Sequence, residues 1–257
     1  KYFVKGAAMS TWDIWIAAYL FAFQIYYDFS AYSDMALGIG NFFGYDLTRN
    51  FDTPYVSQNP QEFWKRWHIT LSSWIRDYIY IPLGGSRKGF ARGIVAVVLA
   101  MTISGLWHGA SWTFVLWGLY HGLLSAGHRI WKKTVGKRIR GGPVVRLLNT
   151  LTFFQFTAIG WVFFRVANPA DLGPMLIKML TFGELELGPH ALHYIVLIAG
   201  LVVLHIVEAT ALRRRTALWT WWQSRVPAPV RGFIYAAAVL VISVFLRPKA
   251  NAFIYFQ

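Results

Sequence analysis

The chain has 257 residues, of which 56% are hydrophobic, 18% aromatic and only 14% charged, and its mean hydropathy is positive. This composition excludes a soluble globular domain and indicates a polytopic membrane protein. The lack of cysteine excludes disulfide bonds and catalysis by a thiolate. A formal net charge of +14 would favour a nucleic-acid partner in a soluble protein. Here we expect no nucleic acid, because the basic residues lie between hydrophobic segments, as membrane topology requires.

The first hydrophobic segment covers residues 12–27 and is apolar enough to enter the bilayer, and we expect its helix to extend further in either direction. Asp28 and Asp34 follow it among aromatic and small residues, a setting typical of acids that face a bundle interior or a water-filled cavity. Capping or pairing with arginine is favoured slightly over catalysis for both acids. Because the chain begins with Lys1 and no signal peptide follows, we expect it to be the C-terminal part of a longer protein.

A helix start is recognisable after the polar connection 48–59. Asn59 can cap the helix, with Pro60 at the first helical position and Glu62 at the third. The pattern predicts one amphipathic helix to about Pro82, at the membrane interface or the bundle edge. Its apolar face, with spacings of three and four, consists of Trp64, Trp67, Leu71, Trp74, Ile75 and Tyr78.

On such a helix His68 and Arg76 would project from one line about 12 Å apart, with Asp77 beside that line. These three residues fit either a reaction site or an ordinary ion-pair network. The next residues, 83–93, form a Gly-rich basic loop with Arg87, Lys88 and Arg92. The loop fits a binding site for a phosphate-bearing ligand, and equally a cytoplasmic turn.

The run from Gly93 to Leu124 contains no Lys, Arg, Asp or Glu. If the loop before it and the basic stretch after it are both cytoplasmic, the chain must enter the membrane and return. We expect the break at His108 and Gly109, with two arms of about 22 to 30 Å. Such arms scarcely cross the hydrocarbon core, so the sequence predicts a short or re-entrant hairpin with His108 near its tip.

An ionisable residue at bilayer depth is costly, so His108 is a candidate for function. The alternative is a structural histidine bonded to a backbone carbonyl, but Gly105 and Gly109 favour the close approach of a ligand or another backbone. His121 and His128 share one helical face in the second arm. We predict no metal site there, because a third ligand at suitable spacing is lacking.

Charge alternates along the rest of the chain. Residues 129–146 and 208–231 are rich in Lys and Arg, whereas residues 165–189 carry both signs. The positive-inside rule therefore makes the two basic stretches cytoplasmic and the mixed stretch external. Three further membrane helices are expected, at about 147–164, 190–207 and 232–246.

Three stretches within residues 28–131 closely resemble the membrane-bound O-acyltransferase (MBOAT) superfamily, and within it the bacterial alginate O-acetyltransferase branch. They are DFSAYSDMALGIGNFFG, NFDTPYVSQNPQEFWKRWHITLSSWIRDYIYIPLGGSRKG and GLWHGASWTFVLWGLYHG. The resemblance implies an all-α, polytopic transmembrane helix bundle with a donor tunnel from the cytoplasm and an acceptor cavity on the opposite side. Residues 1–257 would be the C-terminal part of one such membrane domain, with 28–131 as its catalytic region and 147–246 as scaffold.

In that family the histidine that matches His108 is catalytic, and the position that matches His68 lines the reaction site. A neutral imidazole at His108 would act as general base, taking the proton of a hydroxyl as it attacks a thioester. Asp77 and Arg76 would help orient the acceptor or stabilise the oxyanion. The remaining candidates are Trp107 and Trp67 as supporting residues, and Arg87 and Lys88 as donor-binding residues.

The favoured function is transfer of an acetyl or other short acyl group from a cytoplasmic thioester, such as acetyl-CoA, towards an exported polysaccharide such as alginate. Expected partners are the lipid bilayer and the polysaccharide or periplasmic acetyl-acceptor proteins, in a bacterial inner membrane, with no bound cofactor. Alternatives are D-alanyl transfer to teichoic acid, a transporter or proton pathway, and an inactive scaffold. The lack of a second copy of the hairpin speaks against a transporter.

Overall fold

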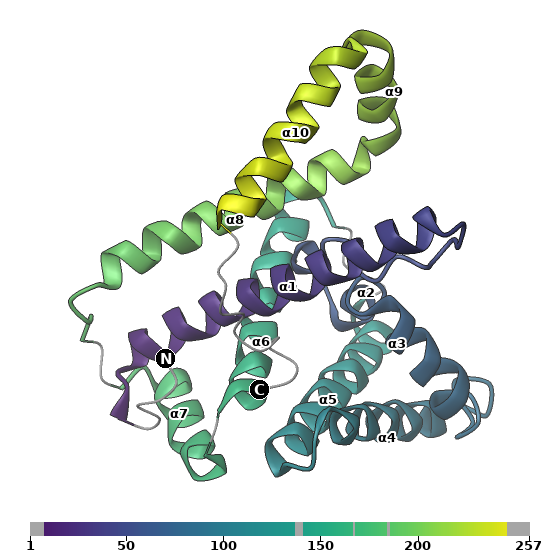
Figure 1. The fold of residues 1–257 in the computed structure, drawn as a ribbon. Helices are drawn as coiled ribbons and strands as arrows, with labels where there is room; N and C mark the ends of the chain where they lie inside the picture. The colour runs from purple at the N-terminus through teal and green to yellow at the C-terminus, as the bar shows by residue number, and fades with distance from the viewer. Residues whose placement is uncertain (1–7, 137–140, 167, 184–185, 246–257) are drawn as a thin grey trace. The chain divides into compact units, whose positions relative to one another are not determined.

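The computed structural model describes residues 8–136, 141–166, 168–183 and 186–245 (Figure 1). Within these ranges the regular elements are helices and no strand is present, which confirms the all-α prediction. The chain divides into two compact units, residues 1–203 and 204–257. Among the described residues, three helices are long and apolar enough to cross a membrane, namely α4 (Phe90–His108), α6 (Pro143–Arg165) and α8 (Ala191–Arg213), and α9 (Arg215–Arg225) with α10 (Ala228–Phe245) would be a fourth as one bent span. The protein is therefore a multi-pass membrane protein.

The first unit contains the candidate site. Its elements, up to the start of α8, are α1 (Thr11–Phe42), η2 (Pro54–Val56), α2 (Pro60–Phe63), α3 (Ile69–Ile75), η3 (Arg76–Tyr80), α4 (Phe90–His108), α5 (Trp112–Thr134), α6 (Pro143–Arg165), α7 (Pro169–Thr181) and α8 (Ala191–Arg213). Helix α8 continues across the boundary between the units. The second unit contains the rest of α8, then α9 (Arg215–Arg225) and α10 (Ala228–Phe245).

Helix α1 is longer than the predicted segment 12–27. It begins at Ser10, whose hydroxyl accepts a hydrogen bond from the backbone N–H of Asp13 at 3.2 Å. It continues through Asp28 and Asp34 to Phe42, because no proline or capping sequence interrupts it. The first half of α1 packs against α6 and α7 in a buried core. Its members include Ile14, Trp15, Ala18, Ala158, Val162, Leu172, Met175 and Met179.

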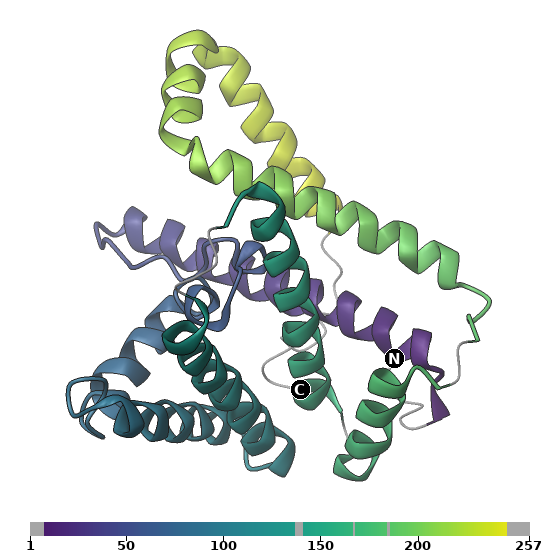
Figure 2. The ribbon, with the colours of Figure 1, turned by 180° about the vertical axis from the view of Figure 1, so that it is seen from behind.

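Helices α4 and α5 form a hairpin that breaks where expected, at His108 and Gly109. Its two helices, of 19 and 23 residues, are each longer than the corresponding predicted arm, and α4 is long and apolar enough to cross a membrane, so the expectation of a short or re-entrant hairpin is not confirmed. The two helices lie side by side in both views (Figures 1 and 2). Their backbones touch at glycines: a Cβ atom on Gly118 would lie 2.3 Å from the carbonyl oxygen of Met101, and one on Gly105 would lie 2.2 Å from that of Phe114. Small residues permit this close approach, as they do in other membrane helix pairs.

The prediction of one continuous helix from Pro60 to Pro82 is wrong. Its start is correct, since the Asn59 side chain accepts from the N–H of Glu62 at 2.9 Å. The helix ends at Phe63, however, and α3 starts only at Ile69. The backbone of the break pairs with a distant segment: Asp52 N–H donates to Arg66 O at 3.0 Å. These tertiary hydrogen bonds replace those that a continuous helix would have made.

Two helices lie in stretches for which we predicted no helix. Helix α7 occupies part of the stretch 165–189, which we predicted to be external, and its buried side chains join the core of the first unit. Helix α9 occupies part of the basic stretch 208–231. In the second unit the indole N–H of Trp222 donates to the Tyr235 hydroxyl at 2.9 Å, which ties α9 to α10.

Candidate functional site

His68 lies in the break before α3, in a backbone conformation that is unusual for a residue with a side chain. Its φ of 43° and ψ of 58° are in the left-handed region. Two backbone hydrogen bonds flank it, from Asp52 to Arg66 and from Ile69 to Asn50 O, the latter at 2.9 Å. The irregular segment around Asn50 therefore holds His68 in this conformation. His68 and Arg76 do not share a helical line, so that part of the prediction is wrong.

The imidazole of His68 is mostly buried and packs edge-on against Phe29, with 4.8 Å between the ring centroids. Its Nδ1 lies 3.1 Å from Oδ1 of Asn50. Burial lowers the pKa of His68 to about 4, so the ring is neutral at neutral pH. A neutral imidazole has one nitrogen free to accept a hydrogen bond, which is what an acceptor hydroxyl needs from a neighbouring group.

His108 is the last residue of α4 and lies among aromatic rings from three helices. The centroid of its ring is 5.1 Å from that of Trp117 in α5, 5.2 Å from that of Phe164 in α6 and 5.0 Å from that of Trp107. Trp117 is almost fully buried, whereas Trp107 is 61% exposed. The cage holds the imidazole at the tip of the hairpin, where the chain turns.

A continuous layer of aromatic side chains connects the two histidines. Trp67 is 2% exposed, and its ring contacts Phe51 beside His68 and Trp161 of α6, with centroid distances of 5.1 and 4.8 Å. Trp161 in turn stacks on Trp117 at 6.2 Å, next to His108. The two imidazoles are also near enough to interact electrostatically. The structure thus brings His68, Trp67 and His108 into one region.

The other predicted residues lie outside this layer. Arg76 and Asp77 are exposed and form a two-point ion pair with each other, at 2.7 and 2.8 Å. The pairing raises the pKa of Arg76 and lowers that of Asp77. Arg76 and Asp77 therefore form the ordinary ion pair that the sequence leaves open as an alternative. They do not lie beside His68, where they could orient an acceptor. Arg87 and Lys88 lie in the exposed loop between η3 and α4.

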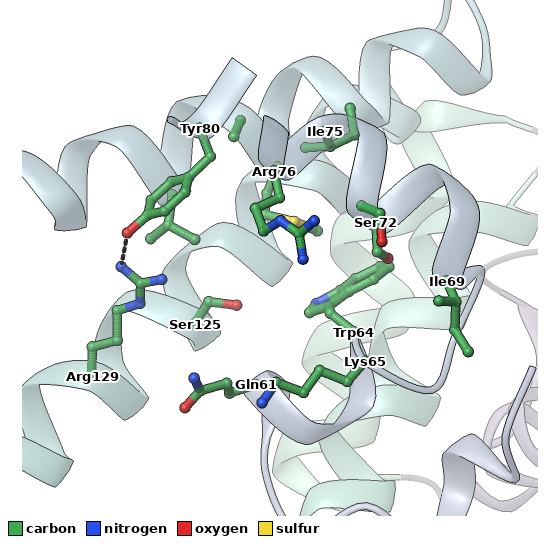
Figure 3. A pocket seen from close by; sticks show the side chains of 14 residues that line it. Gln61, Trp64, Lys65, Ile69, Ser72, Ile75, Arg76, Tyr80, Ser125 and Arg129 are labelled. Carbon is green, nitrogen blue, oxygen red and sulfur yellow. Dashed lines mark hydrogen bonds between the residues drawn. The ribbon is translucent and has the colours of Figure 1, made fainter. Parts of the chain in front are cut away.

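A cavity of about 460 Å³ opens among α2, α3, η3, α4 and α5 (Figure 3). Among its lining residues are three cations, Lys65, Arg76 and Arg129, together with the hydroxyls of Ser72 and Tyr80. Arg129 donates to the Tyr80 hydroxyl at 2.7 Å, which fixes its side chain at the rim. Much of the remaining lining is apolar, including Trp64, Ile69, Val97 and Met101. Such a cavity suits an anion attached to an apolar chain.

Sequence reasoning missed three residues of this region. Asn50 lies in what we interpreted as a polar connection, and only its long-range partners distinguish it from other loop amides. Lys65 and Arg129 are unremarkable basic residues in the sequence. What the two residues share is that they line one cavity between helices. The pattern of residues along a single helix does not reveal such a cavity.

Comparisons with known proteins agree with these observations. The model of "MBOAT, membrane-bound O-acyltransferase family" matches residues 7–138. A protein of Azotobacter vinelandii named "Probable alginate O-acetylase AlgI" is 43% identical over 176 residues, which are 68% of this chain and 34% of that protein. The peptidoglycan O-acetyltransferase of Helicobacter pylori is 43% identical over 166 residues, 65% of this chain and 31% of that protein.

A more distant relative is the teichoic acid D-alanyltransferase of Streptococcus thermophilus, 35% identical over 129 residues, which are 46% of this chain and 31% of that protein. The matched part thus spans about a third of the length of these relatives. The family match covers α1 to α5, including His68, the hairpin with His108, and Phe51, Trp67 and Trp117 of the aromatic layer, whereas Trp161 lies in α6, beyond the matched residues. The chain therefore belongs to the membrane-bound O-acyltransferase family.

Proposed function

We propose that the protein, within its complete membrane domain, transfers an acetyl or similar short acyl group from a thioester to a hydroxyl. Two kinds of relatives that match at 43% identity are named for O-acetyl transfer, and those named for D-alanyl transfer match at 35% or less. This difference favours acetyl over D-alanyl as the group transferred. The observation that carries the proposal is the aromatic layer that joins His68 to His108.

The proposed reaction uses His108 as general base. Its imidazole takes the hydroxyl proton while the hydroxyl oxygen attacks the thioester carbonyl, and the resulting tetrahedral intermediate expels the thiolate. The proton then passes from the imidazolium to the leaving sulfur, so the group returns to its neutral state. The apolar rings of Trp117 and Phe164 would keep water from one side of the imidazole, and so disfavour hydrolysis of the thioester.

The donor in this proposal is a cytoplasmic thioester such as acetyl-CoA, bound as substrate rather than as a resident cofactor. The cavity with Lys65, Arg76 and Arg129 suits its phosphates, because three cations and an apolar lining occur together there. Arg87 and Lys88, in the nearby exposed loop, stay proposed as outer donor contacts. Arg76 would then serve the donor, and Asp77 would hold its guanidinium in place.

We further propose a bacterial inner membrane as the location, and an exported polysaccharide such as alginate, or a periplasmic acetyl-acceptor protein, as the acceptor. The test is the O-acetyl content of the polysaccharide in cells deleted for the full-length gene. The cells are complemented with wild type, with His108→Ala, or with His193→Ala as a control at an exposed histidine, at matched membrane levels. We expect ester with wild type and His193→Ala, and a loss of at least about a hundredfold with His108→Ala.

Each other result contradicts one part of the proposal. Equal ester with His108→Ala would make that histidine structural. No ester with any of the complementing genes would reject the proposed polysaccharide. Membrane vesicles given radiolabelled acetyl-CoA or a D-alanyl carrier protein then identify the donor. A proton flux that depends on His108 without any acyl transfer would favour the transporter alternative.

A further inference from the structure

The Asn50 side chain has one determined orientation in the structure. Its Oδ1 lies 3.3 Å from the backbone N–H of Thr70, and a backbone N–H can only donate. Its Nδ2 donates in the opposite direction, to the Ser33 hydroxyl at 3.3 Å. A hydroxyl can pair with either end of an amide, so the Thr70 contact is the one that identifies the oxygen, and the orientation does not depend on His68.

This orientation determines which nitrogen of His68 carries the proton. Oδ1 of Asn50 is an acceptor and lies 3.1 Å from Nδ1 of His68, so Nδ1 must donate. The Thr70 hydroxyl donates to the same Oδ1 at 3.0 Å and lies 3.4 Å from Nδ1. In the neutral ring, a proton on Nδ1 leaves Nε2 with a free lone pair.

Asn50 also holds the backbone on which the ring stands. Its carbonyl oxygen accepts from Ile69 N–H at 2.9 Å, directly after the left-handed His68. That conformation costs roughly 1 kcal/mol or more for a residue with a side chain and persists only where the surroundings impose it. Phe29, packed edge-on at 4.8 Å, restricts the plane of the imidazole. One residue therefore fixes both the position and the tautomer of His68.

We propose that Asn50 is a positioning residue that keeps His68 in the Nδ1–H tautomer, so that Nε2 accepts a hydrogen bond from a second hydroxyl of the acceptor sugar, next to the one that is acylated. This inference rests on the proposed acyl transfer. His68 would orient the acceptor so that the oxygen of the reacting hydroxyl faces the thioester, while His108 removes the single proton of that hydroxyl. No covalent step involves Asn50 itself.

The test compares two substitutions in the full-length protein. Asn50→Asp keeps an oxygen that accepts from Nδ1 and adds a charge, whereas Asn50→Leu keeps the approximate volume and removes the acceptor. We expect Asn50→Leu to lower kcat/KM for the acceptor by about tenfold to a hundredfold, the effect that loss of a histidine's orienting partner has in metal sites. Asn50→Asp should retain most activity, and its carboxylate should move the acid limb of the pH profile to higher pH. Asn149→Leu, at an exposed position of α6, is the control.

A second measurement does not depend on activity. Solid-state nitrogen NMR of the protein labelled in histidine, with His68→Asn to assign the signal, distinguishes a protonated Nδ1 from a protonated Nε2. We expect protonated Nδ1 in wild type and in Asn50→Asp, and a loss of this preference in Asn50→Leu.

The two measurements separate the inference from the proposed function. Protonated Nε2 in wild type would overturn the tautomer assignment whatever the enzyme does. Protonated Nδ1 with unchanged kcat/KM in Asn50→Leu, or an unshifted pH profile in Asn50→Asp, would overturn the positioning role. If wild type transfers no acyl group while the tautomer is as inferred, the proposed function fails and the role in acyl transfer falls with it.

Discussion

At the residue scale, the neutral state of His68 makes the stability of the protein depend on pH. Burial lowers the pKa of the folded imidazole to about 4, below its ordinary value of 6.5, so the unfolded chain binds the proton more readily. The stabilising contribution of the neutral ring is therefore complete above pH 6.5 and is lost progressively as the pH falls towards 4.

We predict that His68→Asn weakens this dependence, because an amide does not titrate. From the pKa shift, wild type should lose at most about 2 kcal/mol between pH 7 and pH 5 through this one group. Thermal unfolding of the purified full-length protein in detergent at several pH values measures the difference. His193→Asn, at an exposed histidine, should follow wild type. If the unfolding temperatures of wild type and His68→Asn change with pH in the same way, the folded protein does not hold the His68 imidazole neutral.

At the scale of elements, the hairpin was predictable and the region before it was not. An uncharged run with glycines beside His108 is a local pattern, and the break between α4 and α5 lies where that pattern predicts it. The helix from Asn59 also begins as its capping residues indicate. It stops early because residues around Asn50 and Asp52 bond to the backbone of residues 66–69, a pairing that the helical pattern does not contain.

The same limit applies to the site. His68 and His108 are recognisable from motifs that resemble those of a family. Their connection through Trp67, Trp161 and Trp117 depends on α6, which lies far along the chain. Asn50 was missed for the same reason: an amide in a loop becomes a candidate only when its oxygen is found beside an imidazole.

The contact between α4 and α5 gives a prediction at this scale. A Cβ atom on Gly118 would lie 2.3 Å from Met101 O and 3.0 Å from Thr102 Cα, and backbone atoms cannot rotate away. Gly118→Ala should therefore separate the helices and lower the free energy of unfolding by about 2 kcal/mol or more. Gly127→Ala is the matched control on α5, because nothing lies within 4 Å of the added Cβ. It should leave stability unchanged or raise it by up to about 1 kcal/mol. Equal unfolding midpoints for the two variants would contradict the close helix contact.

At the scale of the whole molecule, the membrane topology follows from charge and from the positions of the spans. Helices α6 and α8 are both long and apolar enough to cross, and the stretch between them is the one without a basic excess. The two flanking stretches, residues 129–146 before the main part of α6 and residues 208–231 at the end of α8 and beyond, are basic. The positive-inside rule therefore predicts that residues 129–146 and 208–231 lie in the cytoplasm and residues 165–189 outside.

Residues 1–257 contain no cysteine, so single cysteines can report this topology once any cysteine elsewhere in the full-length protein has been replaced. We predict that Glu186→Cys in the full-length protein reacts with a membrane-impermeant maleimide added to intact spheroplasts. Lys132→Cys and Arg225→Cys, which are equally exposed in the structure, should react only after the membrane is opened. The denatured protein provides the control for complete labelling. Reaction of all three cysteines from the same side would mean that α6 and α8 do not both cross, and the donor cavity beside Arg129 would then lose its assignment to the cytoplasmic face.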